Sequence, residues 1–345
     1  MGESHKLTMA TLGFPSIGVG TDGATSMRET VELAKQAEAL GFDSFWLAGG
    51  YHSRSAVVRA TLIATTTSRI KIGLGILSPH TKHPALLAMD AASLNEVARD
   101  RVILGVGRVL NALRKHAIDS RGTVQLVKES IAIVKGILGG DHFQYSGSRF
   151  RIASPGSRLD LEPCGKLPVY VGATGPEMLR LAGQYADGVL FNYPCTAGFI
   201  RYAMPIIEEG LSRGGRTLDD FDIAAYLLIS VDNDEKAALN AAKRFVAQKL
   251  PTRHSNMLAH AGVTAAEIGA VRDSVERFGL VKAAAAIDDD LVRKVAIAGT
   301  PDQVVQGLTQ FLGTGLKLPI AWEIIGPDRR HSLDLLARAV LPKLA

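Results

Sequence analysis

Small and polar residues that follow an apolar stretch of the sequence form the pattern with the clearest chemistry. The apolar run 168–172 ends at Gly172 and is followed by Ala173, Thr174, Gly175 and Pro176. Proline favours the first position of a helix, so a helix is expected to begin there. The first amides of a helix have no intrahelical partner and carry its positive dipole end, and small residues let an anion approach them. This loop is predicted to bind phosphate; the alternative is an ordinary strand-to-helix turn.

Glycines inside a second apolar run, 70–77, predict a further contact with a ligand. Gly73 and Gly75 interrupt that run, and glycine within a strand marks a bulge or a place where a flat ligand lies on the backbone. Gly75, Ile76 and Ser78 are therefore candidate ligand-binding residues.

Three polar side chains are candidates for proton donation or for holding a substrate: Tyr51, His80 and Arg108. His80 and His83 have no third metal ligand nearby, so a polar loop that contacts substrate is favoured there and no metal site is predicted. Arg108 follows Gly105 and Gly107 at the end of the run 101–106, where a guanidinium can pair with an anionic group. A surface arginine is the alternative.

A G-x-G-x-x-G segment at residues 18–23 could indicate a dinucleotide-binding fold. Two observations count against that interpretation. Pro15 interrupts the preceding strand, and Asp43 opens the second strand, although the ribose-binding acid belongs at its end. We therefore expect residues 18–23 to form a flexible loop between the first strand and the first helix.

Strand and helix patterns alternate along the whole chain. A helix is expected at Met27–Leu40, where apolar residues recur at helical spacing. Eight nearly continuous apolar runs are typical of strands buried on both faces. Eight such strands with helices between them predict a closed parallel (β/α)8 TIM barrel of the α/β class. The eight runs are Thr8–Phe14, Asp43–Leu47, Ile70–Leu77, Arg101–Val106, Pro168–Gly172, Gly188–Asn192, Ile223–Val231 and Leu318–Ile325.

Two stretches exceed a minimal barrel and are expected to be insertions. Residues 139–167 are rich in Gly, Ser, Asp and Pro, and residues 251–290 add helical material. The aspartates at 288–290 are expected to start a helix. Without an internal repeat or a low-complexity linker, residues 1–345 are predicted to form a single domain.

The composition excludes several classes of protein. With 345 residues, of which 47% are hydrophobic, the chain can bury a core without disulfides. The only cysteines, Cys164 and Cys195, imply no disulfide framework and fit a cytoplasmic location. No signal peptide or membrane span is recognisable. The net charge of +5 comes from scattered bases without interleaved aromatics, so neither nucleic acid nor membrane is an expected partner.

These motifs resemble the luciferase-like superfamily, in particular its branch that uses the deazaflavin coenzyme F420. The resemblance extends from about Thr8 to Leu344 and is most specific at 73–84, 101–111 and 168–192. It implies the same barrel fold.

The resemblance also implies roles for individual residues. A cis peptide bond between Gly75 and Ile76 would form a bulge that supports the deazaflavin ring. Asn111 would approach the ring, and the coenzyme phosphate would lie on the loop Gly172–Pro176. A homodimer is expected, and assembly with another chain, as in the bacterial luciferases, is the alternative.

The sequence departs from the family at the usual proton donors. Where many relatives carry Asp-His after the second strand, this chain has Gly49 and Gly50. Arg108 and Leu110 stand at or near acidic positions, and an acid near the first strand is missing at residues 13–15.

The function implied by the resemblance is hydride transfer between coenzyme F420 and an unidentified small organic molecule. Two alternatives stay open. One is a flavin mononucleotide (FMN)-dependent monooxygenase on the same barrel, and the other is a catalytically silent coenzyme-binding subunit.

Overall fold

The fold is a closed barrel of eight parallel strands, as the alternating sequence pattern predicts. The computed structural model describes residues 16–49, 53–140, 142–161 and 167–344. Each strand pairs with its neighbour in the order given below, and the last pairs with the first to close the barrel. The strands are β1 (Gly18–Thr21), β2 (Ser44–Leu47), β3 (Lys71–Leu77), β4 (Val102–Val106), β7 (Val169–Gly172), β8 (Gly188–Phe191), β9 (Asp222–Val231) and β11 (Leu318–Ile325).

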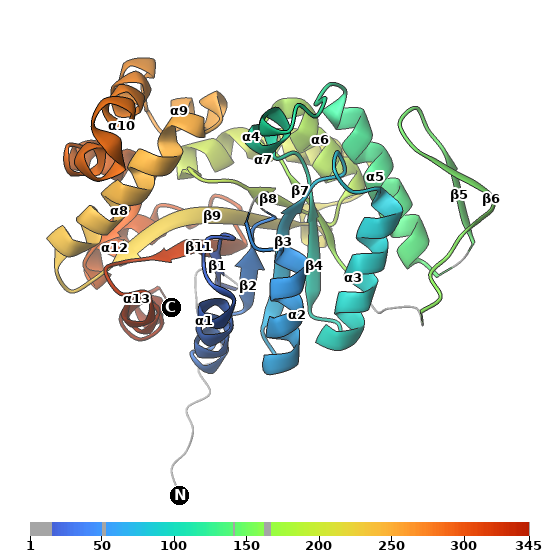
Figure 1. The fold of residues 1–345 in the computed structure, drawn as a ribbon, viewed down its shortest axis with the longest axis horizontal. Helices are drawn as coiled ribbons and strands as arrows, with labels where there is room; N and C mark the ends of the chain where they lie inside the picture. Colours follow the sequence, from blue (N-terminus) through green and yellow to red (C-terminus); the bar gives the residue numbers. More distant parts are fainter. Residues whose placement is uncertain (1–15, 50–52, 141, 162–166, 345) are drawn as a thin grey trace, which may run out of the picture.

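Helices connect the strands and cover the outside of the barrel (Figure 1). None of those in the described ranges is long and apolar enough to cross a membrane. The α-helices are α1 (Met27–Ala39), α2 (Ala56–Thr66), α3 (Pro84–Ala98), α4 (Leu110–Lys115), α5 (Thr123–Leu138), α6 (Pro176–Tyr185), α7 (Ala197–Arg213), α8 (Glu235–Lys249), α9 (Ser255–His260), α10 (Ala265–Ala285), α11 (Asp289–Val295), α12 (Pro301–Thr309) and α13 (Arg329–Leu335).

The first helix shows how local sequence sets these elements. Ser26 caps α1 by accepting a hydrogen bond from the amide of Glu29. Leu33, Ala34 and Ala37 recur at helical spacing and are buried against the barrel. The helix ends one residue before the predicted boundary.

The expectation for the G-x-G-x-x-G segment is wrong, because its first four residues form the strand β1. The glycines make room for side chains of the neighbouring strands. A Cβ atom on Gly18 would lie 2.6 Å from Oγ of Ser44, and one on Gly20 would lie 2.8 Å from the Trp322 ring. The strand expected at 8–14 lies outside the described residues.

The first predicted insertion contains an antiparallel hairpin of β5 (Phe143–Ser146) and β6 (Arg151–Ser157), at the right of Figure 1. The carboxylate of Glu129 in α5 holds the tip of this hairpin. It accepts hydrogen bonds from the amides of Ser148 and Phe150, both at 2.9 Å.

The second predicted insertion is helical, as expected, and contains a 3-10 turn at Leu250–Thr252 followed by α9 and α10. Asp288 caps α11 through the amide of Asp290, which confirms the predicted helix start. The short strand β10 (Ile297–Gly299), which pairs with β9 outside the barrel, was not predicted.

Candidate functional site

The end of β3 bulges into the C-terminal mouth of the barrel. The peptide bond between Gly75 and Ile76 is cis, which confirms the bond implied by the resemblance. Tyr226 of β9 donates a hydrogen bond of 2.9 Å to the carbonyl of Gly75. The side chain of Ile76 packs over Gly107 and Gly172, where added Cβ atoms would lie 2.6 and 3.1 Å from it. The bulge therefore adjoins the ends of β4 and β7.

The same bulge explains why residue 49 is a glycine. A Cβ atom on Gly49 would lie 2.1 Å from the carbonyl oxygen of Ile76, far inside normal contact distance. Glycine at this position thus gives the bulge its space. Gly50 and Tyr51 lie outside the described residues.

The expectation that a flat ligand lies on the β3 glycines is corrected at Gly73. A Cβ atom there would lie 2.2 Å from the ring of Trp46, so the protein's own indole covers this position. Trp46 is fully buried in the barrel interior. The corresponding face of Gly75 is also filled, because a Cβ atom there would lie 2.2 Å from the Tyr226 hydroxyl oxygen. Only the Ile76 side of the bulge is left for a ligand.

The predicted phosphate loop ends in an open helix terminus. Gly175 is the N-cap of α6 without a side-chain capping bond, and Pro176 is the first helical residue, as predicted. A Cβ atom on Gly175 would find no atom within 4 Å. Asn256 of α9 donates a hydrogen bond of 2.9 Å to the carbonyl of Thr174 and fixes the loop. Free amides next to open space fit a phosphate group.

Two further residues of this loop region do not assist the binding of an anion through their side chains. Ala173 is buried beneath the loop and contributes no polar group. Glu177 is exposed in the first turn of α6 and adds a negative charge that an incoming phosphate has to tolerate.

Ser78 and His80 belong to one chain of polar contacts. Oγ of Ser78 lies 3.4 Å from Nδ1 of His80, and Nε2 of His80 lies 3.1 Å from Oγ1 of Thr123. Burial lowers the pKa of His80, and the positive charge of Arg108 lowers it further. His80 is therefore neutral near pH 7, and it is suited to hydrogen bonding rather than to donating a proton as a cation.

Arg108 lies just beyond β4 with an exposed side chain. It makes no hydrogen bond or ion pair inside the described ranges. Its charge lowers the pKa of both His80, in the loop after β3, and His254, the residue before α9. Asn111 follows in α4.

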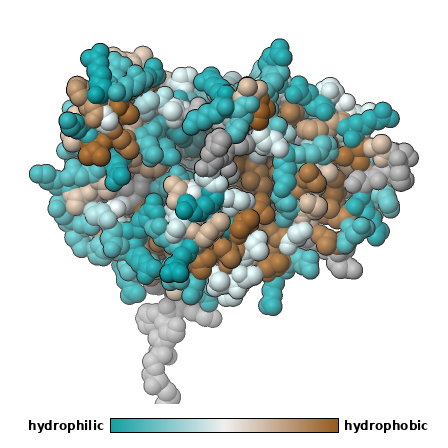
Figure 2. Space-filling model, in the orientation of Figure 1, coloured by the Kyte–Doolittle hydropathy of each residue, from teal (hydrophilic) through white to brown (hydrophobic). Residues whose placement is uncertain are grey.

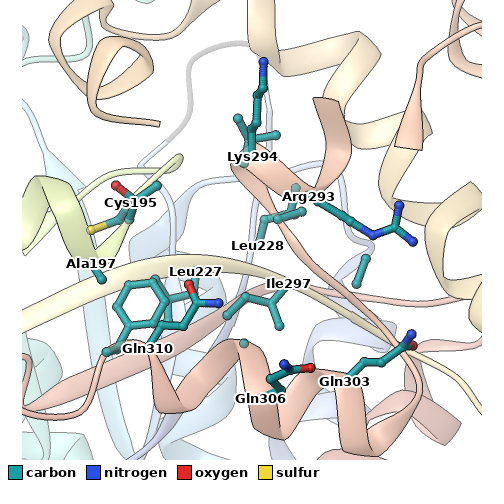
Figure 3. Close-up of a pocket in the computed structure, with 16 residues that line it drawn as sticks. Cys195, Ala197, Leu227, Leu228, Arg293, Lys294, Ile297, Gln303, Gln306 and Gln310 are labelled. Carbon is teal, nitrogen blue, oxygen red and sulfur yellow. The ribbon is translucent and has the colours of Figure 1, made fainter. Parts of the chain in front are cut away.

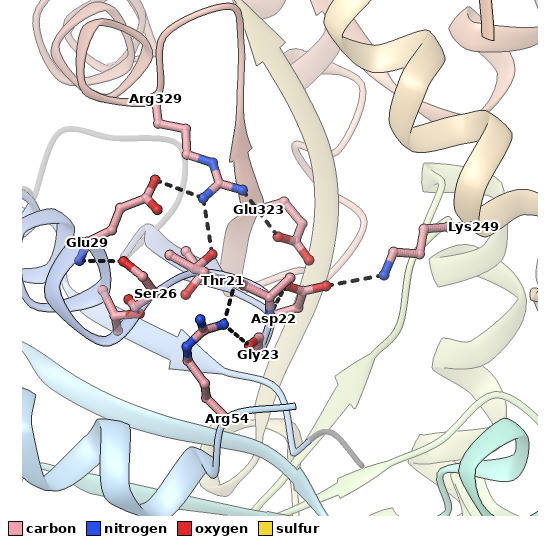
Figure 4. A network of polar contacts seen from close by, with 12 residues as sticks. Thr21, Asp22, Gly23, Ser26, Glu29, Arg54, Lys249, Glu323 and Arg329 are labelled. Carbon is pink, nitrogen blue, oxygen red and sulfur yellow. Dashed lines mark hydrogen bonds and ion pairs between the residues drawn. The ribbon is translucent and has the colours of Figure 1, made fainter. Parts of the chain in front are cut away.

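Sequence reasoning missed a group of buried and partly buried charged side chains near the ends of β1 and β11 (Figure 4). Asp22 follows β1, and its carboxylate lies 3.2 Å from Nζ of Lys249. Arg59 of α2 is fully buried and donates to the carbonyls of Thr21 and Asp22. Glu323, near the end of β11, is only 4% exposed.

The two carboxyl groups in this group titrate very differently. Burial raises the pKa of Glu323 to about 8, and repulsion from Asp22 adds to the effect. Burial also opposes ionisation of Asp22, but Lys249 and the amide of Ala24 outweigh it and lower the pKa of Asp22. Near pH 7 one carboxyl is therefore protonated and its neighbour is ionised. The sequence offered one signal, a lone glutamate inside an apolar strand.

A separate cavity of about 340 Å³ lies between β9, β10, α12 and the start of α7 (Figure 3). It is lined by Cys195, Lys294 and Gln306, among others. None of the predicted site residues lines it, so it is distinct from the barrel mouth.

Comparison with known proteins places this geometry among enzymes. Residues 7–317 match the family described as luciferase-like monooxygenase. The chain is 32% identical over 318 residues to 5,10-methylenetetrahydromethanopterin reductase from Archaeoglobus fulgidus, covering 90% of this chain and 94% of the relative. It is 28% identical over 339 residues to F420-dependent glucose-6-phosphate dehydrogenase from Mycobacterium tuberculosis, covering 92% and 94%.

A solved structure agrees with these matches over almost the whole chain. The coenzyme F420-dependent tetrahydromethanopterin reductase from Methanopyrus kandleri superposes with a TM-score of 0.88 at 29% identity, covering 96% of this chain and 99% of the other.

Proposed function

Because the chain belongs to the luciferase-like monooxygenase family, we propose that it is an oxidoreductase that transfers a hydride between coenzyme F420 and a small organic substrate. One observation carries the proposal. The Gly75–Ile76 bulge and the open N-terminus of α6 meet at one barrel mouth, where Ile76 packs against Gly172. Two similar proteins named for F420 dependence, the glucose-6-phosphate dehydrogenase and the reductase of known structure, are matched over 94% and 99% of their own length.

The bulge and the loop would divide the binding of the coenzyme. When bound, the deazaflavin supplies a ring carbon that donates or accepts a hydride. Gly75 and Ile76 would support the ring, held in place by the Tyr226 hydroxyl on the Gly75 carbonyl. The amides that open α6 and the Thr174 hydroxyl would bind the phosphate, and Ser78 and Asn111 would approach the ring from the ends of β3 and β4.

The remaining polar residues would handle the substrate. Arg108 is exposed beside the mouth, so it would pair with an anionic or strongly polarised substrate group. Both ring nitrogens of the neutral His80 contact hydroxyl groups, so His80 would bind the substrate by giving up the longer, 3.4 Å contact between Nδ1 and Ser78. Tyr51 completes the proposed set of substrate-binding residues.

A turnover screen tests this function. Purified protein is mixed with oxidised or reduced F420 and a panel of small alcohols, aldehydes, ketones, glucose 6-phosphate and 5,10-methylenetetrahydromethanopterin. We expect a change in the visible deazaflavin absorbance with at least one compound. Oxygen-dependent turnover with reduced FMN alone would instead identify a monooxygenase. Tight F420 binding without any turnover would identify a silent coenzyme-binding subunit.

The assembly is proposed to be a homodimer formed through α2 and α3. Five large apolar side chains are exposed on these two helices, and Figure 2 shows apolar surface over them. Exposed apolar patches of this kind mark protein interfaces. The five are Val58, Leu62, Leu86, Met89 and Val97. Sedimentation of the wild type and of Leu86→Glu measures the assembly directly.

We further propose that the chain forms a single domain, and its cytoplasmic location stays a prediction.

A further inference from the structure

The carboxyl pair at the mouth, Asp22 and Glu323, is built unlike an ordinary surface cluster of acids. Glu323 is 4% exposed, and its Oε1 atom has no hydrogen-bond partner in the described part of the chain. The Asp22 side chain keeps 23% of its surface exposed. One carboxyl is thus enclosed while its neighbour reaches solvent.

The backbone at Glu323 is irregular in a way that places this side chain. Glu323 and Ile324 have φ angles of +68° and +49°, in the left-handed region that non-glycine residues seldom adopt. The pairing of β11 with β9 shifts register at the same point, after Trp322. Bulges and such backbone angles recur next to active sites, where they direct a side chain.

The carboxyl pair is connected to the bulge that is proposed to support the coenzyme ring. Tyr226 stacks on Trp322 with ring centroids 3.9 Å apart, and its hydroxyl donates to the carbonyl of Gly75. Glu323 follows Trp322 directly, and its charge acts on the buried Tyr226 hydroxyl. The pair and the bulge therefore face each other across Tyr226.

The surroundings favour a proton rather than a metal cation on this pair. Lys249 lies 3.2 Å from Asp22, and Arg329 lies 4.0 Å from Glu323 but shares its charge with Glu29 at 3.1 Å. Within the described ranges no three metal-ligating side chains gather. The charged and titratable groups that face Glu323 are Asp22, Arg59, Tyr226, Lys249, Arg253 and Arg329.

From these observations we propose that Asp22 and Glu323 are the proton-donating pair of this enzyme, with Glu323 donating to the substrate and Asp22 returning a proton from solvent. The proposal rests on the proposed hydride transfer. It supplies the function of the acids and histidine that are missing at Gly49, Gly50 and Arg108.

When a C=O or C=N bond is reduced, the bound coenzyme would supply a hydride, with its two electrons, that forms a C–H bond on the substrate carbon. The π electrons move to the heteroatom, which takes the proton of the Glu323 carboxyl group. The O–H electron pair stays on Glu323 as a carboxylate, and a proton from water reaches it through Asp22. Oxidation runs the same transfers in reverse.

An infrared pH titration in D₂O tests whether the pair holds the proton. We expect a protonated-carboxyl band in the wild type that disappears around pH 8 and is absent from Glu323→Gln. In Asp22→Asn the midpoint should fall by about one pH unit, because a like charge is removed. Glu208→Gln, at an exposed position on α7, is the matched control and should keep the band. A wild-type spectrum without this band, or an unchanged band in Glu323→Gln, would overturn the proposal.

Two further measurements test the place and the role of the pair. Adding oxidised F420 should raise the midpoint of the band by about one unit, since the ring displaces water beside the pair. With a substrate from the turnover screen, Glu323→Gln should lower kcat about 100-fold while the F420 dissociation constant stays within twofold. A midpoint unmoved by bound F420, or a kcat within twofold of wild type, overturns the proton-donating role. Absence of F420 binding would contradict the proposed function instead, and the titration of the free protein would still test the pair.

Discussion

The two sides of the barrel mouth consist of different kinds of chemical group. The bulge side, formed by Gly49, Gly75, Ile76 and the loop Gly172–Pro176, consists of backbone and of the space that glycines leave. The carboxyl side, formed by Asp22 and Glu323, consists of two titratable side chains, of which Glu323 is enclosed and Asp22 reaches solvent.

This difference determines what each side tolerates. At Gly49 an added methyl group meets the backbone oxygen of Ile76, whereas a change of pH leaves the amides and carbonyls of the bulge side unaltered. On the carboxyl side a substitution of equal shape is accommodated, but gain or loss of one proton changes the interaction energy of the whole group. Steric changes should therefore disrupt the bulge side, and changes of protonation should disrupt the carboxyl side.

The largest effect is expected from Glu323→Gln on the pH dependence of stability. The folded-state pKa of about 8 lies above the ordinary value of 4.5, so the folded protein binds this proton more tightly than the unfolded chain. The stability it contributes is full below about pH 4.5 and is lost as the pH rises towards 8. Glutamine cannot ionise, so the free energy of unfolding of the variant should gain on that of the wild type with rising pH.

The expected relative gain between pH 5 and pH 9 is on the order of a few kcal/mol. Urea unfolding at both pH values measures it, with Glu208→Gln as the control that should follow the wild type. A constant difference between Glu323→Gln and wild type would mean that Glu323 is ionised in the folded protein throughout.

On the bulge side, Gly49→Ala should destabilise the fold by about 1–3 kcal/mol, because its Cβ would lie 2.1 Å from the backbone oxygen of Ile76. Coenzyme affinity should fall as well, since the bulge has to shift. Gly175→Ala is the matched control: its Cβ meets nothing within 4 Å and its φ of −104° suits alanine. Thermal unfolding compares the two, and equal melting temperatures would show that the bulge yields easily.

A charge on the phosphate loop should act on binding without affecting folding. Gly175→Asp places a carboxylate in the open space before α6, and F420 affinity should fall tenfold or more, about 1.4 kcal/mol. Gly175→Asn has the same size without the charge and should bind much better. If both variants bind F420 equally well, no phosphate lies on this loop.

The smallest effect is expected at Arg108, whose side chain is exposed. Arg108→Ala should weaken one ligand by up to about 1 kcal/mol, as exposed ion pairs do. Arg108→Lys keeps the charge but loses the two-pronged geometry, so its effect should be smaller still. Separate titrations with coenzyme and substrate identify which ligand the arginine serves. If neither affinity changes, Arg108 is an ordinary surface residue.

The bulge side was largely predictable from the sequence because its parts are short and contiguous. Gly172–Pro176 is a single run of small residues before a helix, and the β3 glycines stand out inside an apolar strand. The apolar runs also predicted seven of the eight barrel strands. The exception is β1, because its glycines are typical of a loop in the sequence. In the structure they leave space for the side chains of Ser44 and Trp322.

The carboxyl side was not predictable, because its members come together only in the folded barrel. Asp22 follows β1, while Lys249 and Glu323 lie more than 200 residues further along the chain. No local periodicity connects such positions. Asp22 was not predicted for a further reason. The first strand was expected at 8–14, so its end was expected at residues 13–15 and not at Thr21.

Parallel titrations of the wild type with coenzyme F420 and FMN test the central claim most directly. The account predicts that F420 binds at least tenfold more tightly than FMN, and that this affinity is lost in Gly175→Asp but kept in Glu323→Gln. Tighter binding of FMN, or no binding of either coenzyme, would contradict it.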